Sequence, residues 1–234
     1  MLEFLPAEKL KKKFEVFGHF YSIDLAQGQQ IDCRSVLEIV AAKDKPGDIN
    51  LLLKRAADAI FIMMNPGSSL PLEPVNNLFS KKQVGDMCAS LVKTRPDTTQ
   101  YQVMRVMHYC SWSHVRVLNL SDLRNPKGGE FAAQYRDIED RTGFTAHSLF
   151  SGERTWELTS HLNRKSHSPI VCAWGVSPDL YPLIERCLNK LTGIFGRIGL
   201  LKPDTENRYF HPLPTLQKAK INWVNNMVQL INSQ

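Results

Sequence analysis

The sequence predicts an α/β fold, with a three-layer α/β/α arrangement around a small, mostly parallel sheet. Three short apolar runs, rich in β-branched residues and each followed by turn or polar residues, indicate buried strands. They are AIFIMM at 59–64, VRVLNL at 115–120 and IVCAW at 170–174. Segments with helical spacing lie between and after them, at 98–110, 178–195 and 215–231. Such alternation is typical of a parallel sheet covered on both faces.

The length and composition of the chain predict one domain. Of its 234 residues, 43% are hydrophobic and 22% are charged, a balance that suits a single globular core over 1–234. Residues 1–50 form an N-terminal extension to which the sequence assigns no structure. The apolar runs are shorter than the roughly 18 residues of a membrane-spanning helix, and the N-terminus lacks the apolar stretch of a signal peptide. We therefore expect a cytoplasmic protein without a membrane partner.

The cysteine and histidine spacings indicate no metal centre. The five cysteines are scattered, odd in number and never arranged as C-x-x-C, which argues against a disulfide framework, a zinc site and an iron–sulfur cluster. His147, His161 and His167 show no spacing typical of metal ligands and are expected to be solvated. We expect no metal and no other cofactor.

The charge distribution is compatible with nucleic acid. The formal net charge is +6, and the chain from Arg197 onward holds five basic residues against two acidic ones. A local basic excess suits contact with phosphates. DNA is the expected partner, and no obligatory protein partner is evident.

Polar side chains stand where the predicted strands end. Asn65 follows the first apolar run, Asn119 lies at the end of the second, and His211 follows Tyr209-Phe210, which we interpret as a fourth strand. Open parallel sheets bind ligands beyond the carboxyl ends of their strands. The sequence therefore predicts two carboxamides and an imidazole at one edge of the sheet.

Four motifs at these positions resemble the uracil-DNA glycosylase superfamily. They are MMNPG at 63–67, VLNL at 117–120, CAWG at 172–175 and HPLP at 211–214. The resemblance spans 59–215 and implies a uracil-DNA glycosylase-like fold in which Asn65 positions water, Asn119 reads the pyrimidine edge and His211 holds the leaving base. Two positions depart from the pattern, Met64 for the usual Gly and Leu213 for the usual Ser. The same segments resemble, more closely along their length, a bacterial family with an MNP…VVNL…AWG…HPL layout and no known activity.

The chemistry of these side chains fits hydrolysis of an N-glycosidic bond. The base leaves as an anion while positive charge develops on the sugar. A neutral His211 can donate to the base O2, Asn65 can orient a water without deprotonating it, and Asn119 offers one acceptor and two donors. Phe79 is a candidate stacking platform for a flipped-out base. The matched motifs contain no lysine, so we expect a monofunctional enzyme, slower than glycosylases with an aspartate at the position of Asn65.

The residues after Asn65 predict a pocket open at C5 of the pyrimidine. The resemblance implies a blocking tyrosine in uracil-specific enzymes at the position of Gly67, which Ser68 follows here. Asn119 could turn over to read either uracil or cytosine, and the polar segment 125–168 could shape a roomier or a more selective site. Uracil and a C5-modified pyrimidine, such as a bulky modified cytosine of viral DNA, are expected equally. The alternative is that Leu70 or Leu72 fills the gap.

The HPLP segment at 211–214, which we call the His-Pro loop, and the residues after it are expected to contact DNA. Leu213 or Leu216 could fill the space left by the flipped base, and Lys218 and Lys220 could hold phosphates. Two other functions fit the same residues. One is a non-catalytic nucleic-acid-binding module, and the other is a hydrolase of free nucleosides or nucleotides.

Overall fold

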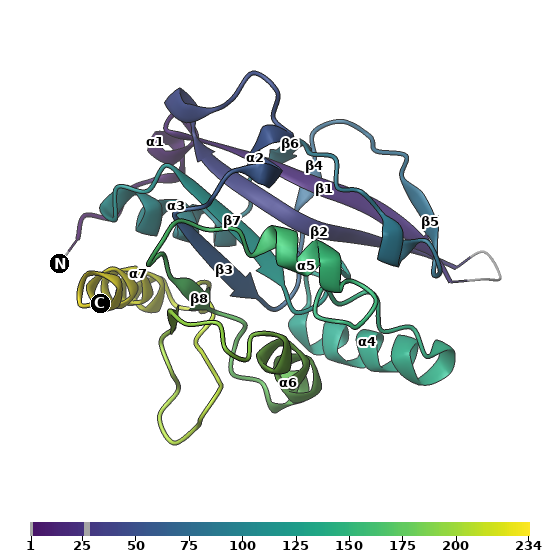
Figure 1. Cartoon of the computed structure of the whole chain (residues 1–234). Helices are drawn as coiled ribbons and strands as arrows, with labels where there is room; N and C mark the ends of the chain where they lie inside the picture. Colours follow the sequence, from purple (N-terminus) through teal and green to yellow (C-terminus); the bar gives the residue numbers. More distant parts are fainter. Residues whose placement is uncertain (1, 26–28) are drawn as a thin grey trace.

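One mixed sheet with helices on both faces forms the protein (Figure 1). The structure is a computed structural model that describes residues 2–25 and 29–234. Within them the strands are β1 (Phe14–Asp24), β2 (Gln30–Ala41), β3 (Ala59–Met63), β4 (Leu70–Pro71), β5 (Leu78–Ser80), β6 (Val92–Arg95), β7 (His114–Asn119), β8 (Ile170–Cys172) and β9 (Arg197–Ile198). The α-helices are α1 (Ala7–Lys11), α2 (Leu51–Lys54), α3 (Thr98–Tyr109), α4 (Gly128–Thr142), α5 (Thr155–His161), α6 (Tyr181–Lys190) and α7 (Gln217–Asn232), and short 3-10 helices span Ala42–Asp44, Val84–Asp86 and Pro178–Leu180.

The α/β class is confirmed, but the expectation of a small, mostly parallel sheet is wrong. In the described residues the sheet has nine strands in the order β4-β6-β1-β2-β7-β3-β8-β9, with β5 beside β1. The half formed by β7, β3, β8 and β9 is parallel. The other half is joined by the antiparallel pairs β2–β7, β1–β2, β1–β6 and β4–β6.

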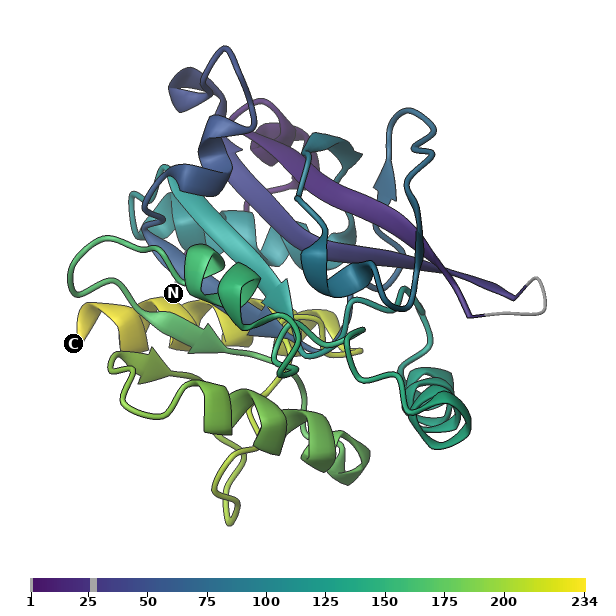
Figure 2. The ribbon, with the colours of Figure 1, turned by 45° about the vertical axis from the view of Figure 1, so that its right-hand side comes forward.

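The N-terminal segment left unassigned by the sequence supplies the two long strands of the antiparallel half. Strands β1 and β2 form a long hairpin that extends past the rest of the sheet (Figure 2). Its residues are buried on both faces, with Val36 and Val40 in one core and Leu37 and Ile39 in the other. Burial on both faces removes the apolar–polar alternation by which a half-exposed strand is recognised.

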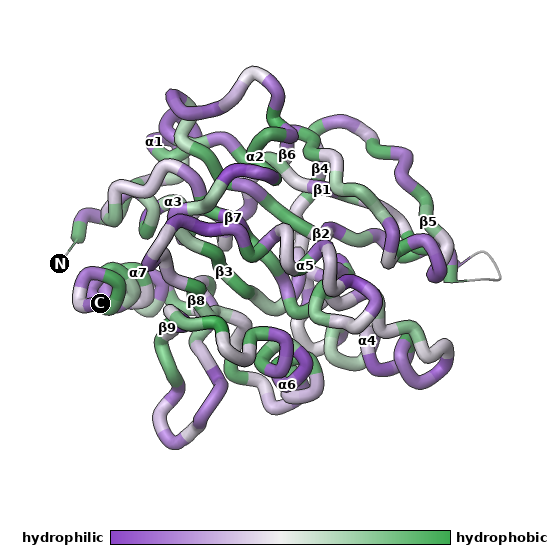
Figure 3. The backbone as a smooth tube through the Cα atoms, in the orientation of Figure 1, coloured by the Kyte–Doolittle hydropathy of each residue, from purple (hydrophilic) through white to green (hydrophobic). Residues whose placement is uncertain are grey.

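The helices divide between the two faces of the sheet. Residues of α2, α4, α5 and α6 belong to one buried cluster, and residues of α1, α3 and α7 belong to the other. Strand β3 serves both, because Ile60 and Ile62 enter the first cluster while Phe61 and Met63 enter the second. Figure 3 shows β3 and β8 as hydrophobic segments at the centre of these layers. The three-layer arrangement is therefore as the sequence predicts.

The three apolar runs are strands β3, β7 and β8, as predicted. The proposed fourth strand is wrong, because Tyr209 forms only isolated bridges with Gly175 and Leu201 while β9 pairs with β8. The helix expected over 178–195 is a 3-10 turn followed by α6, which ends at Lys190. None of the helices in residues 2–25 and 29–234 has the length and apolar content required to cross a bilayer.

Two of the histidines expected in solvent are buried. His147 bonds through Nδ1 to the Ser121 hydroxyl (2.9 Å) and through Nε2 to Glu139 (2.9 Å), and His161 lies 3.5 Å from the Glu157 carboxylate. Glu157 precedes His161 by one turn of α5, whereas Glu139 lies on α4 and His147 lies in the segment after that helix. His167 is exposed, as expected.

Candidate functional site

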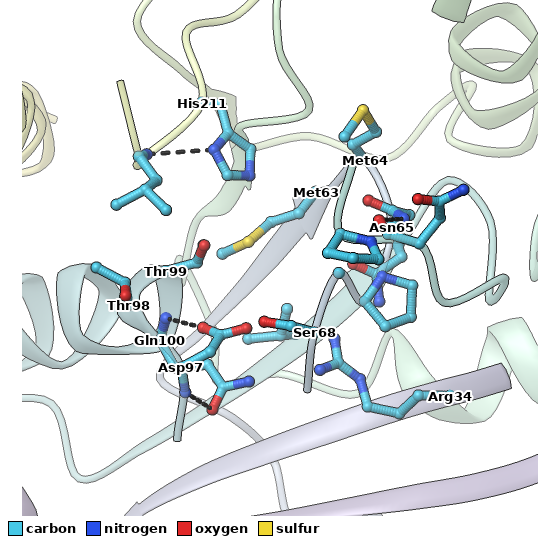
Figure 4. Close-up of a pocket in the computed structure, with 17 residues that line it drawn as sticks. Arg34, Met63, Met64, Asn65, Ser68, Asp97, Thr98, Thr99, Gln100 and His211 are labelled. Carbon is cyan, nitrogen blue, oxygen red and sulfur yellow. Dashed lines mark hydrogen bonds between the residues drawn. The ribbon is translucent and has the colours of Figure 1, made fainter. Parts of the chain in front are cut away.

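A cavity of about 260 Å³ lies at the carboxyl ends of β3 and β7 (Figure 4). The predicted residues Asn65, Asn119 and His211 all line it. The other lining residues come from β2, from β3 and β7 and the segments after them, from the start of α3 and from the His-Pro loop: Arg34, Met63, Met64, Pro66, Gly67, Ser68, Asp97, Thr98, Thr99, Gln100, Val117, Asn125, Pro126 and Leu213. The structure thus brings together the two carboxamides and the imidazole expected at one sheet edge.

The Asn65 amide is fixed by backbone carbonyls. Its Nδ2 donates to the carbonyl oxygens of Asn125 (2.7 Å) and Leu123 (3.3 Å), in the segment that follows β7. These two acceptors settle which end of the amide is nitrogen. The Oδ1 atom is left as the end that can accept a hydrogen bond from a water in the cavity.

The Asn119 amide is held at both ends. Asn119 is fully buried at the end of β7. In the orientation that satisfies both ends, its Nδ2 donates to the backbone carbonyl of Asn65 (3.2 Å) and its Oδ1 accepts from Nη2 of Arg34 (3.0 Å). The freedom to turn over that the sequence suggested is therefore absent, because a turn would break both bonds.

The His211 ring is neutral at physiological pH. Burial lowers its pKa to about 4, because the surroundings disfavour the charged imidazolium. The backbone N–H of Leu213 donates to its Nδ1 (3.2 Å), so the proton of the neutral ring resides on Nε2. Figure 4 shows the side of the ring opposite this bond directed toward Met63 and the cavity. The geometry presents an N–H donor to any ligand in the cavity.

Gln102 fastens the His-Pro loop to the rest of the protein. This buried residue of α3 donates from Nε2 to the carbonyl oxygens of Pro212 and Lys220, both at 2.9 Å. One side chain thereby ties together α3, the loop that carries His211 and the first turns of α7. The position of the imidazole depends on these contacts.

Asp97 and Arg34 line the cavity and were not identified from the sequence. Asp97 caps α3: its carboxylate accepts from the Gln100 N–H (2.9 Å), and the Gln100 side chain accepts from the Asp97 N–H (3.2 Å). Burial raises the pKa of Asp97, and the positive charge of Arg34 partly opposes this. Figure 4 shows the other carboxylate oxygen directed toward Ser68. The D-x-x-Q pattern was a readable helix start, but no local pattern places either residue at the cavity.

The wall at Gly67 is open, as the sequence predicts. Gly67 has φ +60°, and a Cβ added there would meet no atom within 4 Å. Leu70 and Leu72, the residues that could have filled the gap, are exposed and do not line the cavity. Ser68 lines it.

Phe79 is not where a stacking platform is needed. It lies on β5, which pairs with β1, and its ring meets the Tyr21 ring edge-on with centroids 5.9 Å apart. It does not line the cavity. The expectation for Phe79 is wrong because the chain leaves β3 and crosses to the outer side of β1 before it reaches this residue.

Of the candidate DNA-contacting residues, Leu213 lines the cavity, and Leu216, Lys218 and Lys220 do not. Leu216 precedes α7 with 70% of its surface exposed, and Lys218 and Lys220 lie in the first turns of that helix. Among the residues that the structure describes, no side chain caps the N-terminus of α7, and the first turn of this helix contains no acidic residue. The N-terminus of α7 therefore combines backbone N–H groups without a capping side chain and the positive charges of Lys218 and Lys220.

Comparison of the chain with protein-family models, curated proteins and solved structures finds no match. The resemblance to the uracil-DNA glycosylase superfamily therefore rests on the four motifs alone.

Proposed function

We propose that the protein is a monofunctional DNA glycosylase that releases a flipped-out uracil or C5-modified pyrimidine and leaves an abasic site. The observation that carries the proposal is the meeting of Asn65, Asn119 and His211 around one cavity. At about 260 Å³, this cavity is close to the lower limit of small-ligand sites, roughly 300 Å³. That size suits one base.

The three side chains divide the work of the reaction. As the C1′–N1 bond breaks, its electron pair passes to the base, and the Nε2–H of neutral His211 stabilises the negative charge growing on O2. Asn65 Oδ1 orients a water toward C1′, and the C1′–O bond forms from that water. The proton that the water loses passes to solvent, since the amide does not accept it. Asn119 holds the edge of the base.

The surroundings of the cavity support DNA as the carrier of that base. The open N-terminus of α7 and the side chains of Lys218 and Lys220 offer donors and positive charge to a phosphate. Leu213 lines the cavity, and Leu216, three residues later, is exposed. In this proposal one of these side chains fills the space that an extruded nucleotide leaves in the duplex. A free nucleoside would require neither feature.

A single-turnover excision assay tests the proposal. Duplexes carrying uracil, thymine opposite guanine, 5-hydroxymethylcytosine or glucosylated 5-hydroxymethylcytosine are incubated with enzyme in excess, and abasic sites are revealed by alkali. We expect at least one base to be released, and N65A and N119A to slow its release. Matched free nucleosides are assayed in parallel.

Three other outcomes would overturn the proposal. Hydrolysis of free nucleosides without release from DNA would identify a nucleoside hydrolase. Tight binding of the duplexes without abasic sites would identify a non-catalytic binding module. Equally fast release of the base by the wild type and by N65A would show that the reaction does not take place at this cavity.

A further inference from the structure

The orientation of the Asn119 amide depends on Arg34. In the orientation that gives both ends of the amide a partner, Oδ1 of Asn119 lies 3.0 Å from Nη2 of Arg34, and Nδ2 lies 3.2 Å from the carbonyl oxygen of Asn65. Turning the amide by 180° would set two oxygens against each other at one end and two nitrogen donors at the other. Asn119 is fully buried, so each conflict would carry the free-energy cost of a buried polar group without a partner. The fixed carbonyl cannot adapt to a turn, and the guanidinium, which only donates, cannot either.

The Arg34 guanidinium is poorly satisfied by the rest of the protein. The side chain is 3% exposed, yet its Nε and Nη1 have no hydrogen-bond partner among the described residues. Its pKa is lowered to about 10 by burial, with Asp97 and Asp122 as the nearby negative charges. A buried charge with unpaired donors costs stability. The hydrogen bond from its Nη2 to Asn119 therefore points to a role at the cavity.

We propose that Arg34 is a positioning residue that locks the Asn119 amide and thereby makes the site selective for one pyrimidine ring type. Uracil-type rings present N3–H and a 4-oxo acceptor, and cytosine-type rings present an N3 acceptor and a 4-amino donor. A freely turning amide can match either pattern, but a locked amide can match only one. This inference rests on the proposed glycosylase function and concerns the same site.

The test compares two substrates that differ only at the edge read by Asn119. 5-Hydroxymethyluracil and 5-hydroxymethylcytosine carry the same C5 group and are placed at the same position of one single-stranded oligonucleotide, where neither base is paired. We expect the single-turnover rates of the wild type to differ by at least about 10², as sites built on specific hydrogen bonds achieve. Either ring type as the preferred one satisfies the proposal.

Three substitutions of Arg34 distinguish a role in fixing the Asn119 amide from a role in the stability of the fold alone. Arg34→Met removes the donor, and Arg34→Gln supplies an amide that can turn together with Asn119. Both should reduce the rate ratio by at least tenfold. Arg34→Lys keeps a group that only donates and should retain most of the ratio. Arg164→Met is the control: it removes a half-buried guanidinium that bonds Ser168 and Phe195 far from the cavity and should leave the ratio unchanged.

A second measurement keeps this inference distinct from the proposed function. Hydrogen exchange of the Asn119 side-chain amide, followed by NMR, should be at least tenfold faster in Arg34→Gln than in the wild type. Equal release of the two bases by the wild type overturns the lock while the glycosylase function stands. A ratio unchanged in both neutral variants also overturns it. If no base is released, the glycosylase function is wrong. Equal hydrogen-exchange rates of the Asn119 amide in the wild type and in Arg34→Gln would then show that Arg34 does not fix this amide either.

Discussion

The backbone N–H of Leu213 donates to Nδ1 of His211 over 3.2 Å, and this bond decides where the ring carries its proton. A neutral ring that accepts at Nδ1 must donate at Nε2. Replacing His211 with alanine removes that donor from the cavity. We expect the single-turnover rate of base release to fall by about 10² to 10³, the usual effect of losing one oxyanion donor. An unchanged rate would show that the imidazole takes no part.

The same ring predicts a pH dependence of stability. The pKa of His211 in the folded protein is about 4, below its ordinary value of 6.5. Between these values the unfolded chain binds the proton and the folded protein does not. The neutral ring therefore contributes stability that is complete above about pH 6.5 and is lost as the pH falls toward 4. Melting temperatures measured from pH 7 to pH 4.5 should fall more steeply for the wild type than for His211→Ala. Parallel curves would contradict the lowered pKa.

Asn65→Asp should not produce a faster enzyme. An aspartate could in principle deprotonate the attacking water, but Nδ2 of Asn65 faces the carbonyl oxygens of Leu123 and Asn125. A carboxylate oxygen placed there would meet two acceptors, at a cost of about 1 to 3 kcal/mol. We expect a lower melting temperature and a rate of base release no higher than that of the wild type. Asn65→Ala, which removes the amide without creating repulsion, is the matched control. A rate gain in the aspartate variant would mean that the side chain leaves these carbonyls.

The strand ends were predictable because each buried strand is a short apolar run that can be recognised from its own residues. Asn65 follows the first of these runs, and Asn119 lies at the end of the second. The two strands are parallel neighbours and therefore end at the same edge of the sheet. Arg34 was not predictable in this way. It reaches Asn119 because its backbone N–H bonds to the Asp122 carbonyl (2.9 Å), in the segment after β7. That contact depends on the antiparallel pairing of β2 with β7, which no single segment of the sequence encodes.

His211 was predicted at the cavity for a partly wrong reason. The sequence placed it after a fourth strand at Tyr209-Phe210, whereas Tyr209 forms isolated bridges and Gln102 holds the following loop. A hydrogen bond from a side chain 110 residues away leaves no mark in local periodicity. The HPLP motif identified His211 as a candidate, but contacts between distant segments, such as that of Gln102 with Pro212, determine its position at the cavity.

The start of α7 predicts a salt-dependent contact with DNA. Lys218 is exposed beside the uncapped first turn of the helix. If it neutralises one phosphate, Lys218→Gln should reduce the slope of log binding constant against log salt by about 0.9. Half-buried Lys190 of α6, which bonds to the Thr155 hydroxyl (2.8 Å) and does not line the cavity, provides the control as Lys190→Gln. Equal slopes for wild type and Lys218→Gln would exclude the contact.

Leu216 predicts a difference between duplex and single-stranded substrates. Its side chain is 70% exposed next to the loop that carries His211. A wedge is needed only where a base must leave a stacked duplex. Leu213→Ala and Leu216→Ala should therefore slow release from a duplex and leave release from a single strand nearly unchanged. Equal slowing on both substrates would assign these leucines to the pocket, and no slowing on either would place the wedge elsewhere.

Gly67 predicts which variant would close the pocket to large bases. An added side chain has space at this position, but the φ of +60° makes every non-glycine residue strained there. Gly67→Ala carries the strain with little bulk, and Gly67→Tyr carries the same strain with a ring that can reach the cavity. Relative to Gly67→Ala, we expect Gly67→Tyr to release uracil at a similar rate and to release glucosylated 5-hydroxymethylcytosine at least about tenfold more slowly, since steric exclusion is worth a few kcal/mol. Rates in excision assays of both variants on both bases check this. If the two variants treat both bases alike, the C5 position of the base points away from Gly67, and this residue has no part in choosing the substrate.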